Sequence, residues 1–518
     1  MSGELLQEEH LIISPKYLWS TVMILGLSFD FLFWKKTPGI SFTIFIFLCL
    51  IAGISLLRFS DLRPARNSLL LLPPVAFLTV MVFVRLEPMT VFLSVSLTFF
   101  LLALFAVTYL GGRWPWYSLP DYIVRFSDLA FSFLAGGARN FLAIYRQTPE
   151  EDASGNMRRL WPAARGILLA LPILAVLTAL LASADLVFSQ RLGDIASLFR
   201  LENVPEYILR CFIIVASALF LAGIYLHAGA KSRDEKHVLG EEPISPFLGF
   251  TEAVIIMGSV VALFAAFVGI QFQYFFGGEK NIDIDGYTYS EYARRGFGEL
   301  VAVAVFSLLL LILLSLFTRR ESIRRKRIFS GLGVGLVALV LVIQVSAFQR
   351  ILLYEDAYGF SRLRTYTHVF MIWLGLLLVA VILLEIMQRH RVFALAAVLA
   401  TIGFVVTLNV INVDGLIVSR NVQRAIDGKE LDVGYLESLS SDAVPALATA
   451  YRSQDNPDQL HDDLGKILAH FAADTDEFTD DPAWQSFHLS RHRADGALNE
   501  LESELMNYRG SQGVSISG

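Results

Sequence analysis

The sequence contains little charge, and this shortage excludes an ordinary soluble enzyme. Of its 518 residues, 17% are charged and 55% are hydrophobic, whereas soluble domains carry about 25% charged residues. A chain this apolar would expose patches large enough to aggregate unless lipid covered them. The composition therefore predicts an integral membrane protein.

Cysteine and the familiar catalytic motifs are also scarce. Cys49 and Cys211 both lie in apolar runs, and they provide neither a disulfide framework nor the spacing of a zinc site. The sequence contains no phosphate-binding loop, dinucleotide fingerprint or nucleophile elbow. It also lacks a basic stripe interleaved with aromatic residues, which would indicate nucleic-acid binding. We therefore expect no cofactor, no metal ion and no nucleic-acid partner.

Long apolar runs are what the sequence does contain. A bilayer core about 30 Å thick is crossed by roughly 20 helical residues. The weakest run is 69–84, where Pro73 and Pro74 lie near the start, and it also fits half of a re-entrant hairpin. We expect about eleven transmembrane helices, at 17–34, 40–57, 69–84, 91–110, 166–184, 211–227, 253–270, 300–317, 328–348, 369–386 and 392–408.

The expected fold class is an all-α integral membrane protein with a small helical C-terminal soluble domain. In the loop after the fourth span, apolar residues recur at helical spacing, which fits either an interfacial amphipathic helix or a helix packed on the bundle. In the soluble region we expect helices at 431–452, with a bend at Pro445, and at 458–471 and 484–508. The expected segments are an N-terminal cytoplasmic segment (1–16), four spans (17–110), a cytoplasmic loop with the amphipathic helix (111–165), seven spans (166–411), an acidic helical domain (412–509) and a disordered tail (510–518).

Lysine and arginine are distributed unevenly between the two sides of this arrangement. Loops on the side of the N-terminus carry 22 of these residues, most densely between Arg319 and Arg327, and the other loops, without the tail, carry 12. Because the richer side is usually cytoplasmic, we expect a cytoplasmic N-terminus and an extracytoplasmic C-terminal domain. Region 412–518 holds 19 Asp and Glu against eight Lys and Arg, so this domain is acidic.

Polar residues gather in four stretches beside the spans, at 183–188, 271–297, 354–366 and 409–421. The eleven-span arrangement places all four on the outer face. Within the second stretch, Thr288 and Glu291 have capping-box spacing, which predicts a helix that begins near Thr288. The candidate ligand-binding residues are Glu291, Tyr292, Arg294, Arg295, Tyr354, Glu355, Asp356, Tyr358, Arg362, Asn412 and Asp414.

The third stretch, 354–366, is the richest in charge and aromatic rings. If it stays helical, Glu355 and Arg362 lie on nearby faces. One ridge is then formed by the side chains spaced four residues apart, which are Tyr354, Tyr358, Arg362 and Tyr366. Such a ridge favours an internal ion-pair and tyrosine network that holds helices together, and it also fits a pocket for an anionic or lipid headgroup.

These stretches resemble the signature of an uncharacterised bacterial family of multi-pass membrane proteins, a domain of unknown function family. The resemblance rests on 354–362 (Tyr-Glu-Asp-Ala-Tyr-Gly-Phe-Ser-Arg) and 291–297 (Glu-Tyr-Ala-Arg-Arg-Gly-Phe), with further similarity at 183–188, 409–424 and 434–447. It covers about 166–447. The resemblance implies a bacterial inner membrane, and it implies no activity because none is established for the family.

Three classes of function fit these observations. The leading hypothesis is a non-catalytic envelope protein that senses or scaffolds, binding a partner protein or a lipid headgroup through the outer-face polar residues. The runner-up is a membrane-embedded transferase or hydrolase for a lipid-linked substrate, with Glu355, Asp356 or Asp414 as acid, base or metal ligand. The third is a transporter, although no acidic residue lies clearly at mid-bilayer. The sequence does not define an oligomeric state.

Overall fold

Helices account for the fold in the residues that the structure describes. The computed structural model describes residues 13–133, 204–232, 247–276, 297–319, 322–453, 457–477 and 483–509, with isolated residues between 170 and 188. Within these segments there is no strand, only an isolated bridge between Leu248 and Thr318. The prediction of an all-α fold is confirmed.

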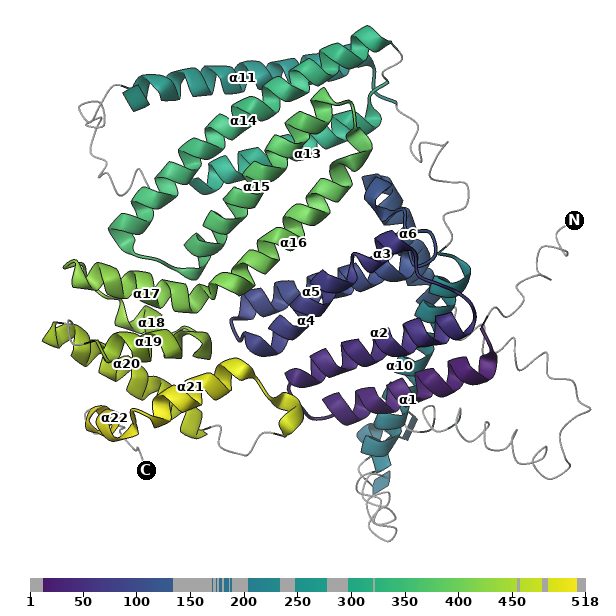
Figure 1. Cartoon of the computed structure of the whole chain (residues 1–518), viewed down its shortest axis with the longest axis vertical. Coiled ribbons are helices and arrows are strands. Elements are labelled where there is room, and N and C mark those ends of the chain that lie inside the picture. Colours follow the sequence, from purple (N-terminus) through teal and green to yellow (C-terminus); the bar gives the residue numbers. More distant parts are fainter. Residues whose placement is uncertain are drawn as a thin grey trace, which may run out of the picture.

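Ten helical segments within the described ranges are long and apolar enough to cross a membrane. They form an N-terminal group of α1 (Pro15–Phe33), α2 (Ile40–Phe59), α4 (Leu72–Val84), α5 (Pro88–Val107) and α10 (Val204–Ala230), and a C-terminal group of α11 (Phe250–Phe276), α13 (Phe297–Phe317), α14 (Ile323–Tyr358), α15 (Arg362–Ile386) and α16 (Phe393–Ile411) (Figure 1). Each coincides with an expected span. The eleventh, at 166–184, lies outside the described residues apart from isolated positions.

The weakest expected span, 69–84, extends between the two ends of the bundle. It consists of α3 (Arg66–Leu69) and α4, which together form a 19-residue apolar segment. At one end, the amide of Ala65 donates to the connection that follows α5 (2.7 Å). At the other end, Arg85 donates to the last turn of α16 (2.8 Å). The segment therefore crosses the bundle and does not turn back as a hairpin would.

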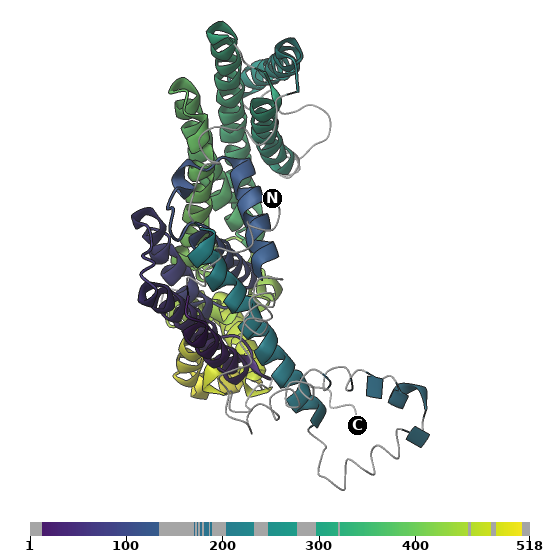
Figure 2. The same cartoon turned by 90° about the vertical axis from the view of Figure 1, so that its right-hand side faces the viewer.

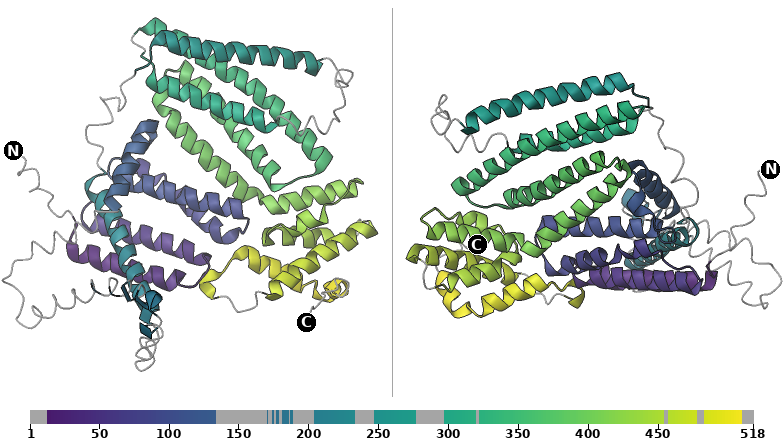
Figure 3. Two further views of the ribbon diagram at one scale, coloured as in Figure 1. Left: turned by 180° about the vertical axis from the view of Figure 1, so that it is seen from behind. Right: turned by 45° about the horizontal axis from the view of Figure 1, so that its top comes forward.

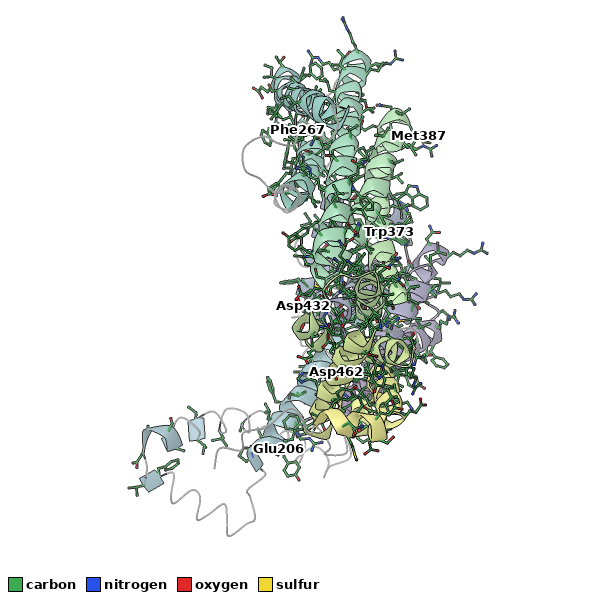
Figure 4. The ribbon with its side chains drawn as sticks, turned by 90° about the vertical axis from the view of Figure 1, so that its left-hand side faces the viewer. Glu206, Phe267, Trp373, Met387, Asp432 and Asp462 are labelled. Carbon is green, nitrogen blue, oxygen red and sulfur yellow. The ribbon has the colours of Figure 1, made fainter. Side chains whose placement is uncertain are left out.

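The two groups are joined by α16. Its residues Ala394 and Val405 belong to the hydrophobic core of the N-terminal group. On the C-terminal side, the Trp373 ring of α15 lies directly against Gly403, and Trp373 Nε1 donates to Thr407 Oγ1 (3.1 Å) (Figure 4). Only glycine leaves room for an indole ring at that position, so this contact fixes α15 on α16.

The helices α1 and α10 lie side by side (Figure 2), and ion pairs join them. Arg210 Nε donates to both carboxylate oxygens of Asp30, to Oδ1 at 3.0 Å and to Oδ2 at 3.1 Å. Beside this pair, Glu206 accepts from Lys35 Nζ and Trp34 Nε1, each at 2.7 Å. The acidic residue in the last turn of α1 therefore has a cationic partner on another helix, which lowers the cost of placing it near lipid.

The loop after α5 contains a helix that packs on the bundle, one of the two alternatives that the sequence left open. The loop holds η1 (Trp114–Trp116) and α6 (Leu119–Phe131), and a further short helix, η5 (His390–Val392), connects α15 to α16. One side of α6 packs on α5 through Phe126 against Phe100, with ring centroids 5.3 Å apart. Ile123 and Phe131 remain exposed, at 69% and 57%. The helix packs on the bundle and still presents an apolar side suited to the membrane interface.

The C-terminal helices gather at one end of the spans (Figure 3). They share a core in which Leu436, Leu447, Leu464 and Leu468 are buried. The set comprises α17 (Val413–Ile426), α18 (Val433–Glu437), η6 (Ser441–Ala443), α19 (Val444–Tyr451), α20 (Asp458–Glu477), η7 (Trp484–Ser486), α21 (Leu489–Asn499) and α22 (Glu502–Arg509). The prediction of a helical C-terminal region is confirmed.

The prediction of one bent helix over 431–452 is wrong. The chain leaves helical geometry after Glu437, and the Ser440 side chain caps η6 by accepting from the Asp442 amide (3.3 Å). Pro445 lies in the first turn of α19, where its missing N–H costs nothing, so it begins a helix instead of bending one. The expected helix over 484–508 is likewise divided into η7, α21 and α22.

Replacing Gly403 with alanine is expected to destabilise the bundle by about 1–3 kcal/mol through overpacking. The added Cβ would lie 2.1 Å from the Trp373 ring. Thermal unfolding of the purified protein in detergent should show a lower midpoint. Gly335→Ala is the matched control, because a Cβ on Gly335 of α14 would meet no neighbouring atom within 4 Å. Equal midpoints for the two variants would contradict the packing described.

Candidate functional site

Four connections between helices meet at the end of the bundle that carries the C-terminal helices. They are the α4–α5 connection, the α14–α15 turn, the α16–α17 joint and the segment that leads into η6. Charged side chains from all four contact one another there. We call this group the polar junction, and it comprises Arg85, Glu87, Arg362, Asp414 and Asp442.

Asp414 is the fully buried member of the polar junction, with no exposed surface. It lies in the first turn of α17, where a carboxylate interacts favourably with the helix dipole. Arg362 donates to it through Nε (2.8 Å) and Nη2 (2.6 Å), and Ser440 donates through its amide (2.8 Å) and hydroxyl (2.7 Å). A two-pronged arginine and two further donors compensate the buried charge within the protein.

Glu87 contributes a second carboxylate to Arg362. Its side chain caps α5 by accepting from the amides of Met89 (3.0 Å) and Thr90 (2.7 Å). The Tyr366 hydroxyl donates to the same carboxylate, and Arg362 Nε lies 3.9 Å from Oε1. The guanidinium therefore lies between a carboxylate at the start of α5 and a carboxylate at the start of α17, and it links the two groups of spans.

Asp442 joins the C-terminal helices to the α4–α5 connection. Its Oδ2 accepts from the amides of Leu86 (2.7 Å) and Glu87 (2.9 Å), and its Oδ1 lies 3.8 Å from Arg85 Nη1. Arg85 also donates twice to the Asn409 carbonyl, at 3.0 and 2.8 Å. Burial lowers the pKa of the Arg85 guanidinium, and the charge of Asp442 opposes this effect.

Two asparagines set the position of α17. Asn412 adopts the left-handed conformation (φ 51°), its side chain accepts from the Gly415 amide, and its Nδ2 donates to the Asp442 carbonyl (3.2 Å). Asn421 pairs with the backbone of Phe360, accepting from its amide (2.8 Å) and donating to its carbonyl (2.9 Å). Asn412 is therefore a structural member of the site, which fixes where α17 begins.

The expected ridge of Tyr354, Tyr358, Arg362 and Tyr366 does not form. The helix α14 ends at Tyr358, because Gly359 adopts a positive φ of 81° that turns the chain into α15. The rings of Tyr354 and Tyr358 lie against each other on α14 at a tilt of 56°, with centroids 4.9 Å apart. Arg362 and Tyr366 lie on α15 and contact the Glu87 carboxylate.

Glu355 has a different partner from the one that the ridge implied. It is 2% exposed, and its Oε1 lies 2.9 Å from His368 Nδ1, whose ring makes an edge contact with Phe348. The remaining polar atoms of these two side chains, Glu355 Oε2 and His368 Nε2, are buried and have no hydrogen-bond partner in the described part of the chain. Asp356 is exposed, and its main-chain carbonyl accepts from Arg424 Nη2 (2.7 Å).

The structure brings only some of the sequence candidates together. Arg362, Asn412 and Asp414 meet at the polar junction, whereas Tyr354, Asp356 and Tyr358 lie at the end of α14 outside it. Four further candidates, and the helix expected to begin near Thr288, lie outside the described residues; these candidates are Glu291, Tyr292, Arg294 and Arg295. Their place in the site stays a prediction.

Sequence reasoning missed most of the residues that surround Arg362 and Asp414 at the polar junction. The Tyr435 hydroxyl accepts from the Arg362 amide (2.7 Å), and burial raises the pKa of this phenol. A signal existed for Glu87, since an acidic residue directly before Pro88 is typical of a helix start. A signal existed for Asp442 too, since it lies in the stretch 434–447 that carries part of the family resemblance.

A second attachment holds the C-terminal helices at the α1–α2 connection. The Ile40 amide donates to the Phe487 carbonyl (3.0 Å), and His488 Nε2 lies 3.0 Å from the Pro38 carbonyl. Because a carbonyl only accepts, Nε2 carries the proton. The other ring nitrogen, Nδ1, is buried without a partner in the described residues. Burial lowers the pKa of His488, with Arg491 acting in the same direction and Asp442 against it.

Comparison with known proteins gives one finding. A family model described as a domain of unknown function (DUF4153) matches residues 72–450. No curated protein and no solved structure gives a match. Within the described segments, no three His, Cys, Asp or Glu side chains gather as a metal ion would require.

Asp414→Asn is expected to lower stability by about 3 kcal/mol, since it removes the closer partner of the half-buried Arg362 guanidinium and leaves only the Glu87 carboxylate, 3.9 Å away. The midpoint of thermal unfolding in detergent measures this. Glu500→Gln is the control, because its partner Arg452 and Glu500 itself are both exposed, and such pairs contribute about 1 kcal/mol or less. If both variants unfold at the same temperature, the pair at Asp414 does not hold the junction.

Acidification is expected to loosen the second attachment. The folded-state pKa of His488 is depressed below its unfolded value of about 6.5. The contact is therefore stable above that pH, and it weakens as the pH falls toward the folded pKa, because a proton on Nδ1 would have no acceptor. Hydrogen-exchange protection of the amides of residues 39–41, corrected for intrinsic rates, should fall between pH 7.5 and pH 5.

His488→Gln keeps a donor for the Pro38 carbonyl but does not titrate, so its protection should change little over the same range. A wild-type pH slope that persists in His488→Gln would assign the effect to another group.

Proposed function

Since the chain belongs to the DUF4153 family, which is described only as a domain of unknown function, we propose a role from its own geometry. The protein is a multi-pass membrane protein. We propose that it acts as a non-catalytic scaffold, which holds its C-terminal helices at the outer face of a bacterial inner membrane for an envelope partner.

The polar junction is the observation that carries this proposal. Asp414 uses its oxygens on Arg362 and Ser440, and Asp442 uses its own on two backbone amides of the α4–α5 connection. A catalytic carboxylate has to reach a substrate. Side chains that are saturated by the protein itself favour a structural joint over the alternative of a lipid-linked transferase or hydrolase.

Attachment at several separate points supports the same conclusion. The C-terminal helices contact the α1–α2 connection through His488, the α4–α5 connection through Asp442 and the α14–α15 turn through Tyr435. Each added point restricts the motion of one body on the other. A domain needed only as a mobile tether would not require these contacts, whereas a domain displayed in a fixed orientation does.

The charge distribution supports the proposed orientation. The basic run from Arg324 to Arg327 begins α14, at the end opposite the polar junction. Arg389 and Arg391 follow α15 at that same opposite end. Basic loops are retained in the cytoplasm, so the C-terminal helices face outward.

A membrane-impermeant bifunctional thiol crosslinker applied to intact cells tests orientation and partner together. The background chain has Cys49 and Cys211 replaced by alanine, and the reporter is Lys466→Cys, an exposed position on α20. We expect labelling at this position and a higher-mass adduct. Arg391→Cys, which is exposed at the opposite end, should not be labelled.

Adding Asp442→Asn to the reporter is expected to reduce the adduct several-fold, because the C-terminal helices are then held less firmly. Glu500→Gln, which breaks only a surface pair, should leave the adduct unchanged. Labelling of Arg391→Cys and not of Lys466→Cys would show that the orientation is the reverse of the one proposed. An adduct that is insensitive to Asp442→Asn would refute the scaffold role.

A further inference from the structure

The outer end of α14 carries two arginines that converge on one short stretch of backbone. Arg364 Nη1 donates to the carbonyls of Tyr358 (3.2 Å) and Gly359. Arg424 Nη2 donates to the Asp356 carbonyl (2.7 Å). Arg424 Nη1 lies close to Gly359, since a Cβ built on this glycine would be 2.6 Å from it. Two guanidinium groups, one from α15 and one from α17, therefore lie beside the same turn.

Arg364 and Arg424 differ in their partners from two other arginines at this end of the bundle. Arg210 and Arg362 each form an ion pair with a buried carboxylate. Within the described residues, neither Arg364 nor Arg424 forms an ion pair with a carboxylate. Arg364 lies over the Tyr354 ring, 4.2 Å from its centroid, and Arg424 Nε is buried without an acceptor.

The helix end explains only part of this arrangement. Arginines commonly bond the last carbonyls of a helix and interact favourably with its dipole. Each guanidinium has five N–H donors, however, and the carbonyls of α14 use a minority of them. Two cations beside one turn, with no carboxylate partner among the described residues, suit an anion with several acceptor oxygens.

The surroundings indicate that this anion belongs to a lipid. Both α14 and α15 are candidate membrane spans that end at this turn. Apolar side chains around it are exposed, including Tyr358 (51%), Leu352 (47%) and Leu363 (69%). Tyrosine rings with arginines beside them are typical of headgroup level in a bilayer.

We propose that Arg364 and Arg424 bind the phosphate of an anionic phospholipid headgroup at the outer end of α14 and α15. The planar fork of arginine matches the oxygens of a phosphate in pairs. This proposal rests on the proposed function, because it names a ligand for the face that carries the C-terminal helices. The lipid would hold that face at the membrane surface.

Native mass spectrometry of the purified full chain, titrated with phosphatidylglycerol, tests the site. The variant with Arg364→Gln and Arg424→Gln should bind this lipid about tenfold more weakly, the loss expected for one or two charge-assisted contacts. The matched control is Arg452→Gln, which should bind as wild type. Arg452 directly follows α19, is exposed and pairs with Glu500. Phosphatidylcholine, whose headgroup has no net charge, should bind weakly to all of these proteins.

The paired lysine variant, Arg364→Lys with Arg424→Lys, keeps the charge but loses the fork, so its affinity should be intermediate. If the glutamine variant fails to fold, the lysine variant still allows lipid affinity to be compared with that of the wild type. Equal phosphatidylglycerol binding by wild type and by either double variant would overturn the proposal. Inorganic phosphate that binds as tightly as the lipid would show that the phosphate site is not a lipid site.

Failure here is distinguishable from failure of the scaffold role. Neither arginine belongs to the polar junction, so the crosslinked adduct of Lys466→Cys should survive loss of lipid binding. If lipid binding is normal while the adduct is insensitive to Asp442→Asn, the scaffold role fails and the lipid site stands.

Discussion

A fully buried carboxylate beside transmembrane helices needs partners in the protein to replace the water it has lost, and Arg362 is the main partner of Asp414. Removing both charges from water costs several kcal/mol per ion, which is recovered only with good geometry and further hydrogen bonds. The two-pronged contact and the Ser440 donors supply these. The start of α15, the start of α17 and the segment before η6 are positioned together for that reason, and the rest of this end of the bundle is arranged around them.

The membrane spans could be predicted because lipid imposes a local rule. Each crossing needs roughly 20 apolar residues in sequence, so ten expected spans coincide with helical segments in the described part of the chain. The run at 69–84 was ambiguous, since its prolines fit either a helix start or a hairpin. Its contacts at both ends of the bundle decide for a crossing. Those contacts are not local, and no window of sequence reveals them.

The candidate site was predictable only in part, for the same physical reason. Arg362, Asn412 and Asp414 were found because charges and amides beside apolar spans stand out. Their partners were not, because Glu87 and Asp442 come from distant connections that the fold brings together. The ridge failed at Gly359, where a single backbone angle ends α14. A four-residue spacing continues through such a break, but the helix does not.

One contact of the junction has a consequence for biogenesis. Asp442 accepts from the amide of Glu87, which precedes it by 355 residues. At roughly 5–20 residues synthesised per second, that amide waits roughly 20–70 s for its acceptor. Throughout this interval the α4–α5 corner has to stay at the bilayer surface with water as its partner. The α4–α5 corner is therefore made long before the residue that completes it, and a helix synthesised much later finishes its hydrogen bonding.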